Sequence, residues 1–173
     1  AGKKVLLIDA DMRRPRIARY LSIDKQEGLS EYLAGISDNA EIIKNTDLGF
    51  DIIVSGNVSS SSAELLATPR VSALLDEYSR NYDYIIIDCQ PSLGITTMNA
   101  LVASNSVIIP VQCEFFALEG ITQLLNSIIM VQSNMNPGLR IEGVLLTMLD
   151  GRTNIGLEVI EEIRGYFKNK VFN

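Results

Sequence analysis

The order of hydrophobic and polar residues along the chain predicts strands that alternate with helices. Two runs of apolar residues, Val5–Ile8 and Tyr84–Ile87, lack polar alternation, which is typical of strands covered by helices on both faces of a parallel sheet. Further apolar runs indicate additional strands. The predicted strands are Lys4–Asp9, Asp51–Val54, Tyr84–Asp88, Ser106–Val111 and Ile141–Thr147.

Apolar residues at helical spacing fill the segments between these strands. Thr68 and Pro69 form a helix start, with threonine at the N-cap and proline at the first helical position. Apolar positions three and four residues apart trace a long helix over Leu118–Gln132 and a last helix over Val159–Phe167. The alternation favours an α/β fold with a mostly parallel sheet flanked by helices.

Three aspartates follow the two most apolar strands. Asp9 and Asp11 come at the end of the first strand, and Asp88 ends the strand over 84–88. In α/β sheets ligands bind outside the carboxyl ends of the strands, and Mg²⁺ favours one or two carboxylates together with substrate phosphates. The pattern therefore favours a nucleotide-phosphate site. In the alternative interpretation, each aspartate only ends its strand and caps the next turn.

Composition and charge narrow the possible classes of protein. A chain of 173 residues with 47% apolar and 21% charged residues is typical of one globular domain, and its net charge of −6 argues against a wholly basic nucleic-acid binder. The absence of histidine excludes histidine-based catalysis and histidine metal ligation. Cys89 and Cys113 have neither a metal-binding spacing nor a disulfide framework, which favours buried free thiols. Neither a signal peptide nor a bilayer-spanning apolar run occurs.

A glycine-rich phosphate loop, Gly-x-x-x-x-Gly-Lys-Ser/Thr, is absent from the sequence. The chain opens on Ala1-Gly2-Lys3-Lys4, and its last residues, Lys170–Asn173, resemble the start of another strand. We therefore interpret residues 1–173 as an interior piece of a larger domain, truncated at both ends and without the phosphate loop.

The second half of the chain resembles a known family. Asp9-Ala10-Asp11 and the run Ile85–Gly94 resemble the deviant-Walker ATPases of the ParA/MinD superfamily, and residues from roughly 80 to 173 are similar to ParA-type partitioning proteins. Gln90 departs from the pattern, because the family usually has a second proline there. The other matching stretches are Asn99–Leu101, Ile109–Glu114, Ala117–Gly120, Gly143–Met148, and the residues Asp150, Arg152, Thr153 and Asn154.

The first half resembles a sister family, the bacterial tyrosine autokinases of capsule and exopolysaccharide export. The similar stretches are Asp11–Arg16, Gly28–Gly35 and Ser62–Arg70. ParA proteins usually carry proline and glutamine after the second aspartate, where this chain has Met12 and Arg13. The chain thus combines kinase-like features before about residue 80 with partitioning-like features after it.

The resemblance implies a P-loop-type sheet, ATP as the nucleotide and Mg²⁺ as the cofactor, so that residues 1–173 would form a single partial ATPase domain. It also implies that the missing first strand, with its phosphate loop, lies between the strands that end in Asp9 and Asp88. It identifies Asp88 as the Walker B carboxylate that holds Mg²⁺ through water, and Asp11 as the residue that orients the attacking water. Asp9 corresponds to a carboxylate near the tyrosine hydroxyl in the kinases and is a second candidate metal ligand. Thr147, at a strand end, matches a position near the adenine base. Its alternative role is that of a simple strand-end hydroxyl.

The family likeness also implies partners. A partitioning ATPase acts as an ATP-dependent homodimer in the bacterial cytoplasm, with non-specific DNA and a partner that stimulates ATP hydrolysis, whereas an autokinase serves a membrane export complex. A degenerate, non-catalytic module is the third possibility, and the chain alone is expected to be inactive. Arg13, Arg14, Arg16 and Arg19 are candidates for phosphate, DNA or oligomer contacts or for a plain solvated surface, and Arg152 for a DNA or dimer contact.

Overall fold

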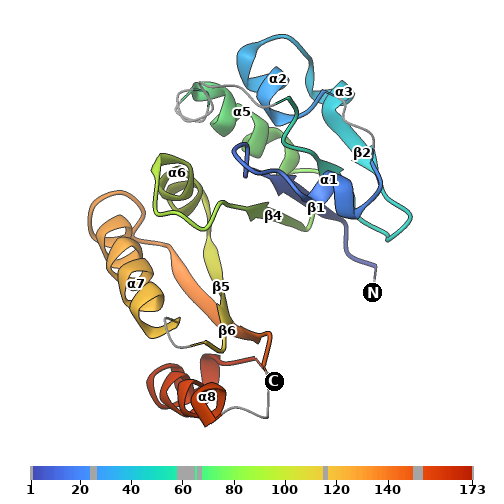
Figure 1. The fold of residues 1–173 in the computed structure, drawn as a ribbon. Coiled ribbons are helices and arrows are strands. Elements are labelled where there is room, and N and C mark those ends of the chain that lie inside the picture. Colours follow the sequence, from blue (N-terminus) through green and yellow to red (C-terminus); the bar gives the residue numbers. More distant parts are fainter. Residues whose placement is uncertain are drawn as a thin grey trace. The chain divides into compact units, whose positions relative to one another are not determined.

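The computed structural model describes residues 2–23, 27–57, 65, 68–114, 117–149 and 154–172. The chain divides into two compact units, Ala1–Ala100 and Leu101–Asn173, and each contains a β-sheet and helices (Figure 1). The predicted α/β class, with mostly parallel strand pairing, is confirmed. No helix in the described parts of the chain combines the length and the apolar character needed to cross a membrane.

The sheet of the first unit has four strands in the order β2-β3-β1-β4. β1 (Val5–Asp9) lies at its centre and pairs in parallel with β3 (Asp51–Ile53) and with β4 (Tyr84–Asp88). β2 (Ile43–Asn45) pairs antiparallel with β3 and was not predicted. The central strands therefore agree with the sequence pattern, and the short edge strand is the addition.

The pairing of β1 with β4 contradicts the expected place of a missing strand. All five residues of β1 are in register with β4, from Val5 opposite Tyr84 to Asp9 opposite Asp88, so no strand lies between them. β4 is an edge strand of this sheet, and Tyr84 and Ile86 are 58% and 52% exposed. The expectation that this strand is buried on both faces is therefore wrong in this structure, because the face that carries Tyr84 and Ile86 is left exposed.

Three helices of the first unit contribute buried apolar side chains to its core, namely α2 (Leu29–Ala34), α3 (Asn39–Ile42) and α5 (Pro69–Tyr78). The short helix α1 (Ile17–Tyr20) has no buried residue, and α6 (Ile95–Ala103) runs across the boundary between the two units. The core includes the buried side chains Leu6, Ile8, Leu33, Ile53 and Leu74. α5 begins as predicted with Thr68 at its N-cap and Pro69 inside the first turn, but the Thr68 hydroxyl donates to the Leu65 carbonyl instead of capping the helix.

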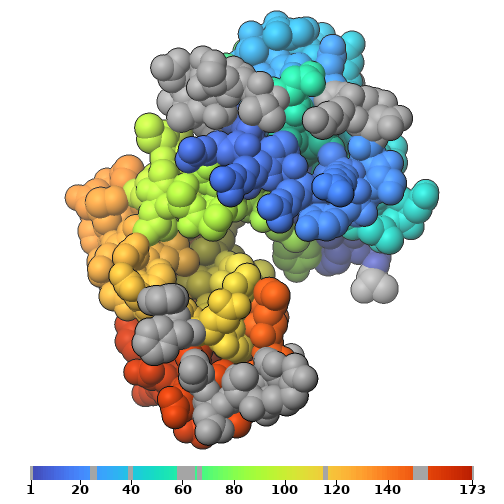
Figure 2. Space-filling view, viewed as in Figure 1, coloured from blue at the N-terminus to red at the C-terminus, as the bar shows by residue number. Residues whose placement is uncertain are grey.

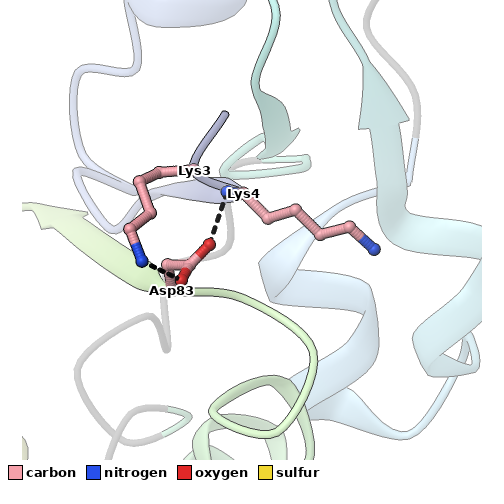
Figure 3. A network of polar contacts seen from close by, with 3 residues as sticks. All are labelled: Lys3, Lys4 and Asp83. Atoms are coloured by element: carbon pink, nitrogen blue, oxygen red, sulfur yellow. Dashed lines mark hydrogen bonds and ion pairs between the residues drawn. The ribbon is translucent and has the colours of Figure 1, made fainter. Parts of the chain in front are cut away.

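Asp83 ties the beginnings of β1 and β4 together (Figure 3). Its carboxylate accepts hydrogen bonds from the Lys3 Nζ at 2.7 Å and from the Lys4 backbone N–H at 2.8 Å. The Asp83 and Tyr84 N–H groups donate in turn to the Lys4 carbonyl. These contacts fix the register of the two strands at their amino ends, so the carboxyl ends also leave the sheet side by side.

The second unit is built on two parallel strands, β5 (Ser106–Gln112) and β6 (Arg140–Thr147). Its helices are α7 (Ala117–Asn134) and α8 (Asn154–Phe167), followed by the 3₁₀ helix η1 (Lys168–Lys170). Ile121, Ile128 and Val131 form the buried face of α7, close to the predicted stripe. Val171 forms a parallel β-bridge with Val144, which agrees with the strand-like character of the last residues.

Candidate functional site

Three aspartates meet at the carboxyl ends of β1 and β4. Asp9 and Asp88 occupy the same level of the sheet, and the N–H of Ala10 donates to the Asp88 carbonyl at 2.8 Å. Asp11 belongs to the same group, because its charge acts on both of the other carboxylates. The strand-end pairing predicted from the two apolar runs therefore produces one acidic cluster, at the edge where ligands bind in α/β sheets.

Asp9 is the buried member of this cluster. Its carboxylate is fully buried, Oδ1 accepts a hydrogen bond from the Asp11 N–H at 3.1 Å, and Oδ2 has no partner among the described residues. Burial, together with the nearby charges of Asp88 and Asp11, raises the pKa of Asp9 to about 6. A buried carboxylate oxygen without a donor is costly, so the site favours a proton or a cation at this position.

Asp11 organises the loop that follows β1. Its Oδ1 accepts hydrogen bonds from the backbone N–H groups of Arg13, at 3.2 Å, and Arg14, at 3.1 Å. An aspartate that binds the backbone two and three residues ahead holds a turn closed. The loop therefore has a defined path from the acidic cluster to the arginines.

The Asp88 side chain is exposed at the end of β4, but its surroundings still shift the pKa of its carboxyl group. Partial burial and the charge of Asp11 raise the pKa of its carboxyl group. Burial and the charges of Asp88 and Asp11 likewise raise the pKa of the adjacent Cys89 thiol to about 11, so Cys89 is a neutral thiol at physiological pH. Cys89 is half-buried and Cys113 buried, both as free thiols.

The loop after Asp88 is held by a residue that the sequence did not single out. The Thr97 hydroxyl lies 2.7 Å from the Ser92 carbonyl and 3.3 Å from the Gln90 carbonyl. Thr97 stands in the first turn of α6, so it links the loop to the helix that follows. The only sequence signal was a hydroxyl residue shortly after a strand-end motif, which is too common a pattern to identify it.

The acidic cluster fits a divalent cation that arrives with a phosphate ligand. Within the described parts of the chain, no group of three or more aspartate, glutamate, cysteine or histidine side chains is arranged to hold a metal ion by itself. Mg²⁺, however, is commonly bound through one or two carboxylates while phosphates and water supply the other ligands. The unpaired Oδ2 of Asp9 and the raised pKa values of Asp9 and Asp88 are the features expected of such a site.

Thr147 belongs to the second unit. It is the last residue of β6, and its hydroxyl donates to the Val111 carbonyl at 3.1 Å, while its carbonyl accepts from the Cys113 N–H. These contacts are those of a strand-end hydroxyl that links β6 to β5. Its role near an adenine base remains a prediction, and Arg152 lies outside the described residues.

Comparison with known proteins places these motifs in a family context. A family model described as an AAA domain matches residues 1–141. The sporulation initiation inhibitor protein Soj of Bacillus subtilis is 46% identical over 99% of the chain, which spans 71% of that protein. The chromosome partitioning protein ParA of Myxococcus xanthus is 41% identical over 99% of the chain, which spans 64% of that protein. The likeness to partitioning proteins thus extends over both halves.

Solved structures agree with this likeness. A Mycobacterium smegmatis protein described as cobyrinic acid a,c-diamide synthase, with bound ATP analogue and magnesium, superimposes with a TM-score of 0.83 at 30% identity, covering 96% of this chain and 71% of that one. The kinase domain of the Escherichia coli tyrosine kinase ETK superimposes with a TM-score of 0.72 at 26% identity, covering 86% and 58%. On this evidence, the chain belongs to the ParA/MinD superfamily of deviant-Walker ATPases and is similar throughout to its ParA and Soj members.

Proposed function

We propose that the protein containing this chain is a Mg²⁺-dependent ATPase of the ParA type, which acts in chromosome or plasmid partitioning as an ATP-dependent dimer. The observation that carries the proposal is the cluster of Asp9, Asp11 and Asp88 at two adjacent strand ends, with one buried carboxylate oxygen unpaired. The names of the ParA and Soj relatives support the partitioning role, and the magnesium-bound neighbour supports the cofactor.

The three aspartates have different tasks in this proposal. Bound Mg²⁺ neutralises charge on the phosphate oxygens of ATP, and Asp88 and Asp9 are the residues that would hold it. Asp11 keeps Oδ1 on the loop N–H groups, which orients its other oxygen to accept a hydrogen bond from the attacking water. Phosphoryl transfer depends mainly on positioning and charge stabilisation, which fixed carboxylates provide.

ATP hydrolysis by point variants of the full-length protein tests these roles. Asp88→Asn removes one charge next to the metal, so Mg²⁺-dependent phosphate release is expected to fall by at least about tenfold. Asp11→Ala is expected to retain nucleotide binding while turnover slows. Asp76→Asn, at an exposed position on α5, is the control for loss of a carboxylate. Hydrolysis at the parental rate by Asp11→Ala would show that its proposed role is wrong.

A tyrosine autokinase is the second candidate function, favoured by the likeness to the ETK kinase domain. It predicts transfer of phosphate to tyrosine, and Tyr20 and Tyr166 are 75% and 70% exposed. Mass spectrometry after incubation with Mg-ATP distinguishes the candidates. The partitioning proposal expects unmodified tyrosines, and phosphotyrosine together with no ATP-dependent retention of DNA at low salt would favour the kinase.

A further inference from the structure

The loop between β4 and α6 carries a side-chain amide next to the acidic cluster. Gln90 lies two residues after Asp88, and the N–H of Ala10 donates to the Asp88 carbonyl at 2.8 Å. The loop therefore begins where the carboxyl ends of β1 and β4 lie side by side. The light-green part of the chain, which includes this loop, reaches the surface in Figure 2. A ligand bound at the acidic cluster would lie beside it.

The Gln90 amide has no partner within the protein. Its side chain is half-buried, and neither the amide oxygen nor the amide nitrogen forms a hydrogen bond with a residue that the structure describes. A glutamine amide offers two N–H donors and one carbonyl acceptor. Polar groups that are partly buried are usually satisfied by a partner, so the free amide is available to a ligand at the cluster.

The main chain around this amide is held in place. The Thr97 hydroxyl lies 2.7 Å from the Ser92 carbonyl and 3.3 Å from the Gln90 carbonyl. Pro91 restricts the preceding residue, Gln90, to an extended backbone. The amide itself lies against Gly94, where a Cβ atom would stand 3.4 Å from the Gln90 Nε2. A donor on a fixed loop loses less conformational entropy when it binds a ligand.

A neutral donor suits a phosphate that approaches three carboxylates. In ATP hydrolysis the water oxygen bonds to the γ-phosphorus, and the bond from this phosphorus to the bridging oxygen breaks, with its electron pair leaving on ADP. One water proton stays on the phosphate product and the other is released to solvent. Donors aimed at the phosphate oxygens stabilise the charge that is redistributed in this step. A glutamine amide donates there without adding a fourth negative charge.

We propose that Nε2 of Gln90 donates a hydrogen bond to a γ-phosphate oxygen of ATP and that this bond strengthens in the transition state, which makes Gln90 a further catalytic residue. The inference rests on the proposed ATPase function. It concerns a position at which this chain departs from the family pattern, since related proteins usually have proline there, and proline has no side-chain donor. The contact is therefore a property of this chain.

Binding of ADP with aluminium fluoride, which mimics the phosphoryl group in transfer, tests the contact separately from turnover. Full-length protein is titrated with Mg-ADP, with and without fluoride complex. In Gln90→Ala and Gln90→Pro the affinity for the complex is expected to fall by at least about tenfold, while the affinity for ADP alone stays parental. Gln90→Glu keeps the size of the side chain but places a carboxylate against the phosphate, so its loss should be larger.

Asn81→Ala is the matched control, because it removes an exposed amide just before the opposite end of β4. Its affinities for ADP and for the fluoride complex should both be parental. ATP hydrolysis by the same samples should slow by at least about tenfold in Gln90→Ala, with little change in KM, since the lost bond acts mainly in the transition state.

The outcomes separate this inference from the proposed function. A parental protein that hydrolyses ATP, with selective loss of the fluoride complex in Gln90→Ala, supports both. Parental affinity for the complex in Gln90→Ala, or an equal loss for ADP alone, overturns the role of Gln90 and leaves the ATPase function standing. Full affinity in Gln90→Glu also overturns it, because the amide would then act as an acceptor. A parental protein that does not hydrolyse ATP overturns the proposed function itself.

Discussion

At the scale of single residues, the molecule maintains an unfavourable charge at Asp9. The Asp9 carboxylate is buried, accepts one hydrogen bond and has two acidic neighbours. Its ionised form is therefore less stable in the protein than in water, and this cost raises its pKa to about 6. Such perturbed groups cluster at functional sites, where a ligand compensates the cost. Asp9 therefore links the stability of the unliganded protein to the chemistry proposed for the site.

The charge on Asp9 predicts how stability depends on pH. The folded state binds the proton more tightly than the unfolded state, whose pKa is near 3.8, so the free energy of unfolding should decrease as the pH rises from about 4 through 6. Asp9→Asn removes this titration and should raise the unfolding free energy at neutral pH by about 1–3 kcal/mol without Mg²⁺ or nucleotide. Urea unfolding across this pH range measures both effects.

Asp76→Asn is the matched control, because it replaces an exposed carboxylate on the same unit. Its unfolding free energy should follow the parental pH dependence. If Asp9→Asn shows that same dependence and no gain in stability, the buried charge has no energetic cost and the cation-binding argument loses its basis.

At the scale of elements, the strands were predictable because an unbroken apolar run with an aspartate at its end can be recognised in the sequence whichever strands lie beside it. β4 has the predicted bounds, and β1 differs by one residue. The order of the strands was not predictable, because hydrophobic periodicity identifies a strand without specifying which strand it pairs with. The three-residue β2 was missed for a related reason, since Ile43-Lys44-Asn45 is too short to show a pattern.

The same distinction applies to the site. Asp9, Asp11 and Asp88 were found from their positions behind apolar runs, whereas their direct proximity depends on the register of β1 against β4. The hydrogen bonds of Thr97 and those of Asp11 to the following loop depend on loop conformations that no local pattern encodes. Sequence therefore predicts the chemical groups, and tertiary structure determines their arrangement.

A prediction at the element scale concerns the close packing of β6 against the end of the chain. A Cβ atom at Gly143 would lie 2.6 Å from the ring of Phe172 and 2.8 Å from the Lys170 carbonyl oxygen. Gly143→Ala should therefore push this segment away from β6 and lower the unfolding free energy by about 1–3 kcal/mol. Urea unfolding midpoints at constant slope give the measurement.

Gly165 provides the matched control, because it lies in α8 with open space around its Cβ position. Gly165→Ala should raise the unfolding free energy by about 0.5–1 kcal/mol, since alanine favours the helix. Equal midpoints for Gly143→Ala and Gly165→Ala would mean that the packing of Phe172 against β6 does not constrain position 143.

At the scale of the whole molecule, each of the two units carries different candidate site residues. The first unit carries the acidic cluster and the arginine-rich loop that Asp11 holds, and the second carries Thr147 on β6.

The fate of the γ-phosphate of ATP tests the central claim most directly. Full-length protein incubated with Mg²⁺ and γ-labelled ATP should release the label as inorganic phosphate, and Asp88→Asn should release it at least about tenfold more slowly. The same label distinguishes all three candidate functions in one experiment. Label that appears on tyrosine, or that remains on ATP in the parental protein, would contradict the account.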